Sequence, residues 1–117
     1  MLTFVCYPQC STCQKAKKWL DDKEIPSELR NIKLQNPTAE ELSLWYKKSG
    51  LPLKKFFNTS GLLYKSMELK TKLPTMTEQE MLELLATDGM LVKRPVLIGV
   101  DFVLTGFKES QWEEHIG

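Results

Sequence analysis

The sequence is poor in the side chains that build metal sites and disulfide scaffolds. It has one histidine, His115, and three cysteines, Cys6, Cys10 and Cys13, in 117 residues. Zinc normally takes four ligands, and no second CxxC pair and no HxxxH pair is present to complete a site. An odd number of cysteines without a secretory signal also argues against a fold held together by disulfides. The lack of further metal ligands and the odd number of cysteines therefore favour a reactive role for the pair Cys10 and Cys13.

Long apolar segments and an excess of one charge are also missing. No run approaches the roughly 18 apolar residues that a membrane span needs. Residues 1–20 lack the basic-then-apolar order and the cleavage site of a signal peptide. The 16 basic and 15 acidic side chains leave a formal net charge of +1, which gives the whole surface little drive toward nucleic acid. We expect a cytoplasmic protein with no membrane segment and no direct contact with nucleic acid.

The pattern of apolar residues in the first third of the chain predicts a strand, a helix and a second strand. The apolar run Leu2 to Tyr7 is typical of a buried strand. A helix is expected from Ser11, and a second strand containing Leu29 and Ile32 runs to the turn at Asn36 and Pro37. Such a unit makes the two strands parallel, with a right-handed crossover.

The rest of the chain is predicted to be helical up to a terminal hairpin. Two capping boxes each open a helix: Thr38 with Glu41, over about 39–48, and Thr77 with Glu80, up to a stop at Asp88 and Gly89. Residues 51–76 combine Pro and Gly with short helical patches, so brief helices are expected there. Residues 94–107 alternate and turn at Val100 and Asp101, which predicts two antiparallel strands before a last helix over about 109–115.

These elements predict one domain, residues 1–117, of the α/β class with a thioredoxin-like fold. The βαβ unit and the hairpin together give a mixed four-stranded sheet flanked by helices, with a helical insertion in the middle of the chain. The sequence has no internal repeat, linker or low-complexity run that would divide it.

The spacing of Cys10 and Cys13 indicates thiol chemistry. The pair joins the end of the first strand to the first turn of a helix, where unsatisfied backbone N–H groups and the positive end of the helix dipole favour thiolate over thiol. Thiolate is the attacking species in disulfide exchange, so Cys10 is the candidate nucleophile. Cys13, one turn later, is the candidate resolving cysteine. The alternative is that both are buried core thiols, which is the interpretation we favour for Cys6 in the strand.

The stretch "KRPV", residues 93–96, is the second informative site. It enters the hairpin on the side where the first strand ends, so Arg94 could present its fork of donors to an anion near Cys10. A solvated arginine is the alternative. Lys15, Lys17 and Lys18 add positive charge to the first helix, and a solvated helix face is the simplest explanation for them.

The segments "YPQCSTCQKAKKWL", "FNTSGLLY", "KRPVLIG" and "LTGF" together resemble the ArsC family of thioredoxin-fold proteins, which includes arsenate reductases and the redox-sensing regulators Spx and MgsR. The resemblance runs over nearly the whole chain. It implies that Cys10 attacks, that Arg94 contacts an anion in the active site, and that the Arg94–Pro95 peptide bond is cis.

Two departures from the reductases qualify this resemblance. Glutaredoxin-linked arsenate reductases of the family use three arginines around the cysteine, and at the positions matching two of them this chain carries Asn58 and Gly106. They also usually lack a second cysteine at the position of Cys13, whereas Spx-like regulators have a CxxC switch. The central segment of this chain resembles the reductase-like branch more than the basic segment of the regulators.

Three functions remain open at this point. The leading hypothesis is a cytoplasmic thiol–disulfide oxidoreductase with no bound cofactor, in which Cys10 attacks, Arg94 steadies negative charge and Cys13 resolves. Glutathione, glutaredoxin or thioredoxin is the expected electron donor. The alternative is a redox-sensing transcriptional regulator that binds the C-terminal domain of the RNA polymerase α subunit. The third is a thioredoxin-like interaction module whose thiols are idle.

Overall fold

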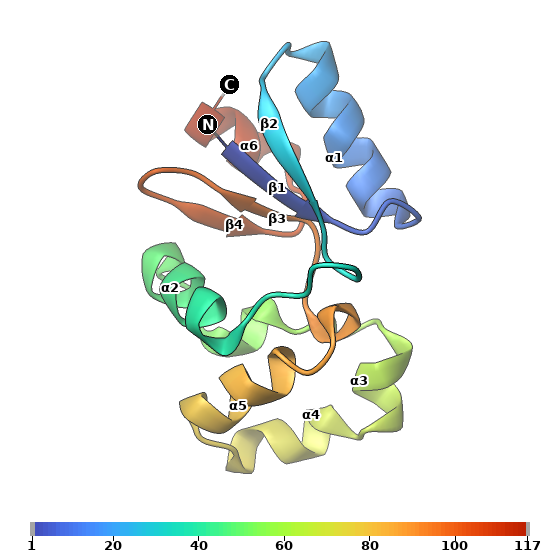
Figure 1. The fold of residues 1–117 in the computed structure, drawn as a ribbon, viewed down its shortest axis with the longest axis vertical. Coiled ribbons are helices and arrows are strands. Elements are labelled where there is room, and N and C mark those ends of the chain that lie inside the picture. Colours follow the sequence, from blue (N-terminus) through green and yellow to red (C-terminus); the bar gives the residue numbers. More distant parts are fainter. Residues whose placement is uncertain (1, 117) are drawn as a thin grey trace.

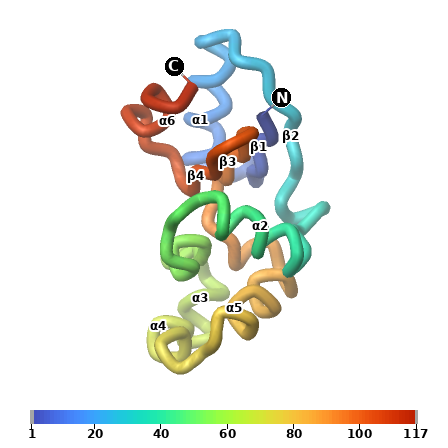
Figure 2. Tube along the Cα trace, turned by 90° about the vertical axis from the view of Figure 1, so that its left-hand side faces the viewer, coloured from blue at the N-terminus to red at the C-terminus, as the bar shows by residue number. Residues whose placement is uncertain are grey.

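The structure, a computed structural model, describes residues 2–116 and confirms the predicted mixed sheet with helices around it (Figure 1). Its sheet has four strands in the order β2-β1-β3-β4. Two of the flanking helices lie beside the sheet, and a group of short helices forms the opposite end of the molecule (Figures 1 and 2). No helix within residues 2–116 is long and apolar enough to cross a membrane.

The sheet is built around the first strand. β1 (Leu2–Cys6) pairs in parallel with β2 (Ser27–Asn31) and antiparallel with β3 (Val96–Ile98), which continues through a tight hairpin into β4 (Val103–Thr105). Both the parallel unit and the terminal hairpin match the sequence-based prediction. Because β1 is central, the residues that follow it lie near the middle of one edge of the sheet, which is where a site can draw on several elements.

The second strand is shorter than predicted. It ends at Asn31, whose side-chain oxygen accepts hydrogen bonds from the N–H groups of Lys33 and Leu34 at 2.9 and 3.1 Å and so closes a turn. Ile32, expected in the strand, is fully buried beyond its end. Leu29 is 49% exposed because β2 is an edge strand.

Alternating strand residues supply two separate cores, one on each face of the sheet. Phe4, Leu97 and Leu104 face α1 (Ser11–Asp22) and α6 (Glu109–Ile116). Trp112 of α6 is fully buried here and packs edge-on against the rings of Phe4, Trp19 and Phe107, with centroid distances of 4.9 to 6.2 Å. This core fixes α1, and with it the CxxC segment, against the sheet.

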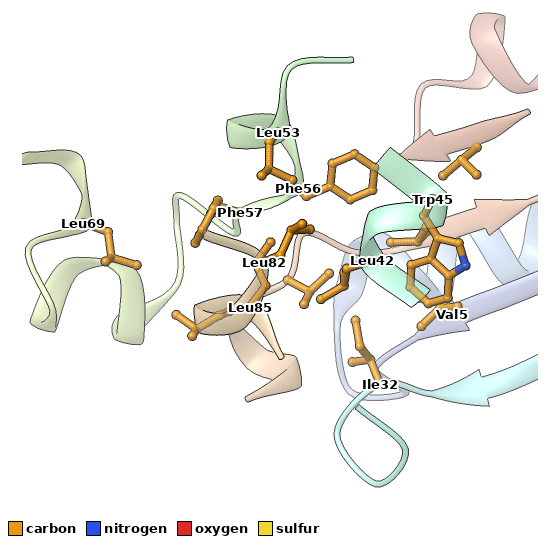
Figure 3. Packing of buried hydrophobic residues seen from close by; sticks show 14 of the residues in the cluster. Val5, Ile32, Leu42, Trp45, Leu53, Phe56, Phe57, Leu69, Leu82 and Leu85 are labelled. Carbon is orange, nitrogen blue, oxygen red and sulfur yellow. The ribbon is translucent and has the colours of Figure 1, made fainter. Parts of the chain in front are cut away.

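The opposite face is covered by α2 (Ala39–Ser49) and the predicted helical insertion (Figure 3). The insertion contains α3 (Leu62–Ser66), α4 (Leu69–Lys72) and α5 (Glu78–Leu85), linked by the short 3-10 turns η1 (Leu53–Phe56), η2 (Leu73–Thr75) and η3 (Gly89–Leu91). Figure 3 shows side chains of α2, η1, α4 and α5 gathered with Val5 of β1.

Helix α5 stops three residues before the predicted end. Its last turn is closed at Thr87, whose hydroxyl donates to the Leu84 carbonyl oxygen at 2.6 Å. Asp88 then caps the η3 turn by accepting a hydrogen bond from the Met90 N–H at 2.9 Å. The predicted stop signal at Asp88 and Gly89 therefore begins a new turn rather than ending the helix.

Both predicted capping boxes are present, and the first is tied to the sheet by an ion pair. Glu41 accepts hydrogen bonds from the Thr38 N–H at 3.0 Å and from Arg30 Nη2 of β2 at 2.9 Å. The hydrogen bond from Arg30, together with those from Thr38, lowers the pKa of Glu41 to about 2 from its ordinary value of 4.5, against the effect of burial. Ionised Glu41 thus helps to hold α2 on the sheet.

Replacing Glu41 by Gln should destabilise the protein at neutral pH by about 0.5–1 kcal/mol, a value kept small because the ion pair is partly exposed. Since the folded-state pKa lies below the unfolded one, the contribution of the carboxylate is present above pH 4.5 and is lost as the pH falls toward 2. Urea unfolding at several pH values measures this. Glu80→Gln, which changes the capping box of α5, is the matched control, and equal, pH-independent losses in both variants would contradict the assignment.

Candidate functional site

The end of β1, the start of α1 and the segments before β3 and after β4 enclose a cleft of about 760 Å³. Its walls carry every residue that the sequence analysis placed at the site except Cys13: Cys10, Asn58, Arg94 and Gly106. Two lysines, Lys93 and Lys108, also line it. The structure therefore brings the candidate nucleophile and the candidate anion contact into one cavity, although they are 84 positions apart in the chain (10 to 94).

Cys10 occupies the N-cap position of α1. Its backbone is extended, with φ −79° and ψ 125°, and its N–H donates to the Tyr7 carbonyl oxygen at 2.9 Å in the turn that contains Pro8. The Cys10 carbonyl oxygen accepts from the Gln14 N–H at 3.0 Å, which starts the helix. The residue thus stands at the positive end of the helix dipole, partly exposed to the cleft.

One expectation about Cys10 is not met. Its side chain makes no capping hydrogen bond with the first N–H groups of α1, although the sequence analysis expected such donors around the sulfur. The side chain lines the cleft instead. Stabilisation of a thiolate by α1 therefore rests on the helix dipole, and the backbone N–H that does reach a cysteine sulfur serves Cys13.

Cys13 lies directly behind Cys10, 2% exposed, with its sulfur accepting the Tyr7 N–H at 3.4 Å. It shares side-chain hydrogen bonds with Cys10 and with Cys6. The hydrogen bond to Cys6, followed by burial, raises the pKa of the Cys13 thiol. Cys13 is therefore held as a thiol next to Cys10, which is the placement that a resolving cysteine requires.

Cys6 is a core residue as predicted, 3% exposed and packed with Phe4 against α1. Its contact with Cys13 was missed by the sequence analysis. The hydrogen bond from Cys13 lowers the pKa of Cys6, with help from the positive charge of Lys17 and against the effect of burial. The contact could have been predicted from strand alternation. Phe4 and Cys6 lie on the face of β1 that α1 covers, and Cys13 lies on the buried side of α1.

Arg94 presents unused donors at the cleft. Its Nη1 donates to the Met90 carbonyl oxygen at 3.3 Å, and its guanidinium carbon lies 5.4 Å from the centre of the Tyr7 ring. The buried Nε has no hydrogen-bond partner, and within residues 2–116 no carboxylate pairs with this side chain. The Arg94–Pro95 peptide bond is cis, as the resemblance implied. The arginine is not a solvated surface residue.

The cleft holds more positive charge than the sequence analysis expected. Lys93 and Lys108 line it beside Arg94, so three cationic side chains border the cavity rather than one. The Lys93 N–H donates to the Phe56 carbonyl oxygen at 2.7 Å, which anchors this segment to η1. Lys93 is the first residue of "KRPV" and Lys108 directly follows "LTGF", and these positions in motifs already singled out are the signal that could have found them.

Asn58 and Gly106, the positions matched to family arginines, also face the cleft. Gly106 has φ +74°, a left-handed conformation that favours glycine. A Cβ atom there would lie 3.0 Å from Cε of Lys93. Position 106 is therefore unsuited to a long side chain in this backbone.

Replacing Arg94 by Ala should weaken the binding of sulfate in the cleft by about tenfold to a hundredfold, because a hydrogen bond to a charged group contributes about 1.5–3 kcal/mol. The fold should be retained, since the guanidinium contributes to the cavity wall. Calorimetric titration with sulfate measures the change, and Lys54→Ala, a cationic position that does not line the cleft, is the control. Equal affinity in Arg94→Ala and the parent protein would show that Arg94 is not an anion contact.

A search against protein-family models finds a match with the ArsC family over residues 6–115. Among curated proteins, the chain is 57% identical to the uncharacterised protein YusI of Bacillus subtilis over 116 residues, 97% of each chain. It is 30% identical to the regulatory protein MgsR of the same organism over 110 residues, which is 94% of this chain and 86% of MgsR.

Solved structures agree with these relationships. A Bacteroides fragilis protein described as related to the ArsC family is 57% identical, with a TM-score of 0.94 over 97% of this chain and 95% of the other. A Streptococcus mutans protein described as a possible arsenate reductase is 43% identical, with a TM-score of 0.88 over 97% and 98% of the two chains. These neighbours confirm the thioredoxin-like fold that the sequence predicted.

Proposed function

Since the chain belongs to the ArsC family, we propose that it is a thiol–disulfide oxidoreductase in which Cys10 attacks the substrate and Cys13 resolves the intermediate. The observation that carries the proposal is the placement of the two thiols. Cys10 lines the cleft beside the unpaired guanidinium of Arg94, and Cys13 is hydrogen-bonded directly behind it. The partly exposed Cys10 can meet the substrate first, and the buried Cys13 can react only with what is already attached to Cys10.

In the first step, the Cys10 thiolate attacks one sulfur of a disulfide substrate. A bond forms between Cys10 Sγ and that sulfur, the substrate S–S bond breaks, and the other half leaves as a thiolate that takes a proton from water. The positive end of the α1 dipole favours negative charge at the position of Cys10. The same positive end lies close to the mixed disulfide on Cys10 when it is later resolved.

In the second step, Cys13 loses its proton and attacks Cys10 Sγ. The Cys10–Cys13 bond forms, and the bound half of the substrate leaves as a second thiolate. The substrate has gained two electrons, and the protein has lost two electrons in forming the Cys10–Cys13 disulfide. One reduced glutaredoxin or thioredoxin, or two molecules of glutathione where the substrate is a different disulfide, would return both thiols.

The cationic lining of the cleft indicates the substrate class. Arg94, Lys93 and Lys108 favour a disulfide that bears carboxylates or another anionic group near the sulfur, and glutathione disulfide has this character. A neutral disulfide of the same size would lack these contacts. We therefore expect anionic disulfides to be better substrates than neutral ones.

A titration of the two thiols tests the proposal. The variant Cys6→Ser keeps only Cys10 and Cys13, so its thiol content in glutathione redox buffers reports this pair alone. The expected result is the loss of two thiols together and of two hydrogens from the protein mass, with two glutathione molecules released for each disulfide that forms. A stable glutathione adduct without an internal disulfide would contradict a resolving role for Cys13.

A redox-sensing regulator is the second candidate, and the identity to MgsR over 94% of this chain is the observation that favours it. In that case the Cys10–Cys13 disulfide would change the surface that α1 offers to the C-terminal domain of the RNA polymerase α subunit. If this domain binds the oxidised but not the reduced protein, and the protein does not turn over disulfides, the protein is a regulator and not an oxidoreductase.

A further inference from the structure

Cys13 is in contact with a cysteine on each side. It shares hydrogen bonds with Cys10, which lines the cleft, and with Cys6, which does not. On the Cys6 side there is a second cavity of about 450 Å³ between α1 and β2, lined by Cys6, Cys13 and Lys17 among others. The three cysteines therefore pack in one cluster, in which Cys10 lines the cleft and Cys6 and Cys13 line the second cavity.

We propose that Cys6 is a third redox-active thiol, which exchanges with the Cys10–Cys13 disulfide and moves it inward to Cys6 and Cys13. The proposal rests on the proposed function, because that reaction supplies the first disulfide. Cys6 has no part in the two steps described above, and the family resemblance assigned it no role. Its contact with the resolving cysteine gives it one.

The exchange needs no outside reagent. The Cys6 sulfur, as thiolate, attacks Sγ of Cys13, a bond forms between these two atoms, and the Cys10–Cys13 bond breaks. Cys10 leaves as a thiolate at the N-terminus of α1, where the helix dipole favours its charge. The proton lost by Cys6 is balanced by the proton that Cys10 takes from water, and the number of disulfides and electrons in the protein does not change.

The contacts around Cys6 suit an attacking sulfur. It packs in the same buried cluster as its target, Cys13, and both residues line the second cavity. The ammonium group of Lys17 provides positive charge nearby, although Lys17 also pairs with Asp21 at 2.9 Å. Burial of Cys6 and Cys13 excludes larger reagents, so exchange within the cluster is favoured over attack from solution.

The exchange would change what the cleft can do. When the disulfide lies between Cys6 and Cys13, Cys10 is again a free thiol facing the cleft, although the protein is still oxidised. The inner disulfide is shielded, because its two residues are 3% and 2% exposed. The protein would then hold oxidising equivalents away from glutathione while Cys10 remains able to form a mixed disulfide.

The position of the one remaining thiol distinguishes the two disulfides. The wild-type protein is oxidised with diamide, its remaining thiol is blocked with N-ethylmaleimide, and the disulfide is then reduced and alkylated with iodoacetamide. Trypsin releases residues 1–15 with all three cysteines, and fragmentation locates the N-ethylmaleimide label. The label falls on Cys6 when Cys10 and Cys13 are joined, and on Cys10 when Cys6 and Cys13 are joined.

We expect label on both positions, with at least about one part in ten on Cys10, which corresponds to a difference of no more than about 1.4 kcal/mol between the two disulfides. The variant Cys10→Ser should form the Cys6–Cys13 disulfide and lose two hydrogens in mass. Label on Cys6 alone, together with a Cys10→Ser variant that keeps both thiols, would overturn the proposal. The variant Cys6→Ser separates this outcome from a failure of the proposed function, because only the latter abolishes its Cys10–Cys13 disulfide.

Discussion

The variant Cys10→Ser is expected to lose disulfide exchange with glutathione disulfide by on the order of a thousandfold or more. A serine hydroxyl in the same place is not ionised at neutral pH and does not attack sulfur as a thiolate does. Cys13 cannot replace it, because that thiol is buried and its pKa is raised by the hydrogen bond to Cys6 and by burial. Initial rates of glutathione release from glutathione disulfide by the fully reduced protein, followed in acid-quenched samples, measure the loss.

Two further variants make this result specific. Ser11→Ala changes an exposed residue next to Cys10 and should keep the parent rate, which controls for disturbance of the helix start. Cys13→Ser should still react once with the substrate but turn over slowly, because the mixed disulfide on Cys10 must wait for an outside thiol. A rate in Cys10→Ser within tenfold of the parent protein would place the reacting thiol elsewhere.

Arsenate reduction should be slow, by about a hundredfold to ten-thousandfold relative to a site with all three arginines of the reductases. Each charge-assisted hydrogen bond that is missing at Asn58 and Gly106 forgoes about 1.5–3 kcal/mol toward a doubly charged oxyanion. Lys93 and Lys108 offset part of this loss as point charges, but they lack the planar fork that Arg94 presents. We therefore expect the smaller end of the range.

A glutaredoxin-coupled assay with arsenate, run in parallel on this protein and on an arsenate reductase of the family that has all three arginines, measures the difference. Asn58→Arg should raise arsenate turnover, since this side chain lines the cleft and the change restores a charged donor there, whereas Gly106→Arg should not, because φ is +74° there. Fast arsenate reduction that is unchanged in Cys13→Ser would indicate an arsenate reductase and contradict the resolving role of Cys13.

Local signals in the sequence predicted much of this structure. The helices that begin after Thr38 and Thr77 start where their capping boxes place them, because a capping box satisfies backbone N–H groups within one turn and needs no distant partner. The start of α1 at Ser11 and the hairpin around residues 99–102 were also predicted from local signals, the turn at Pro8 and the turn at Val100 and Asp101. The strand–helix–strand order then restricted the topology to a parallel pair with a hairpin added.

Features that depend on distant parts of the chain were not accessible in this way. The end of β2 at Asn31 follows from its position at the sheet edge and from a side-chain turn. The lysines of the cleft, Lys93 and Lys108, are ordinary in sequence and become part of the site only because two loops meet at the start of α1. The contact between Cys6 and Cys13 likewise requires the packing of α1 on β1.

The central claim is that Cys10 is the thiol that attacks and Cys13 the one that resolves. The mass of the reduced Cys13→Ser variant after brief exposure to glutathione disulfide, followed by peptide mapping, tests this claim most directly. The account predicts one glutathione per chain, attached to Cys10, and no adduct in the variant that lacks both Cys10 and Cys13. An adduct on Cys6, or no adduct at all in Cys13→Ser, would contradict it.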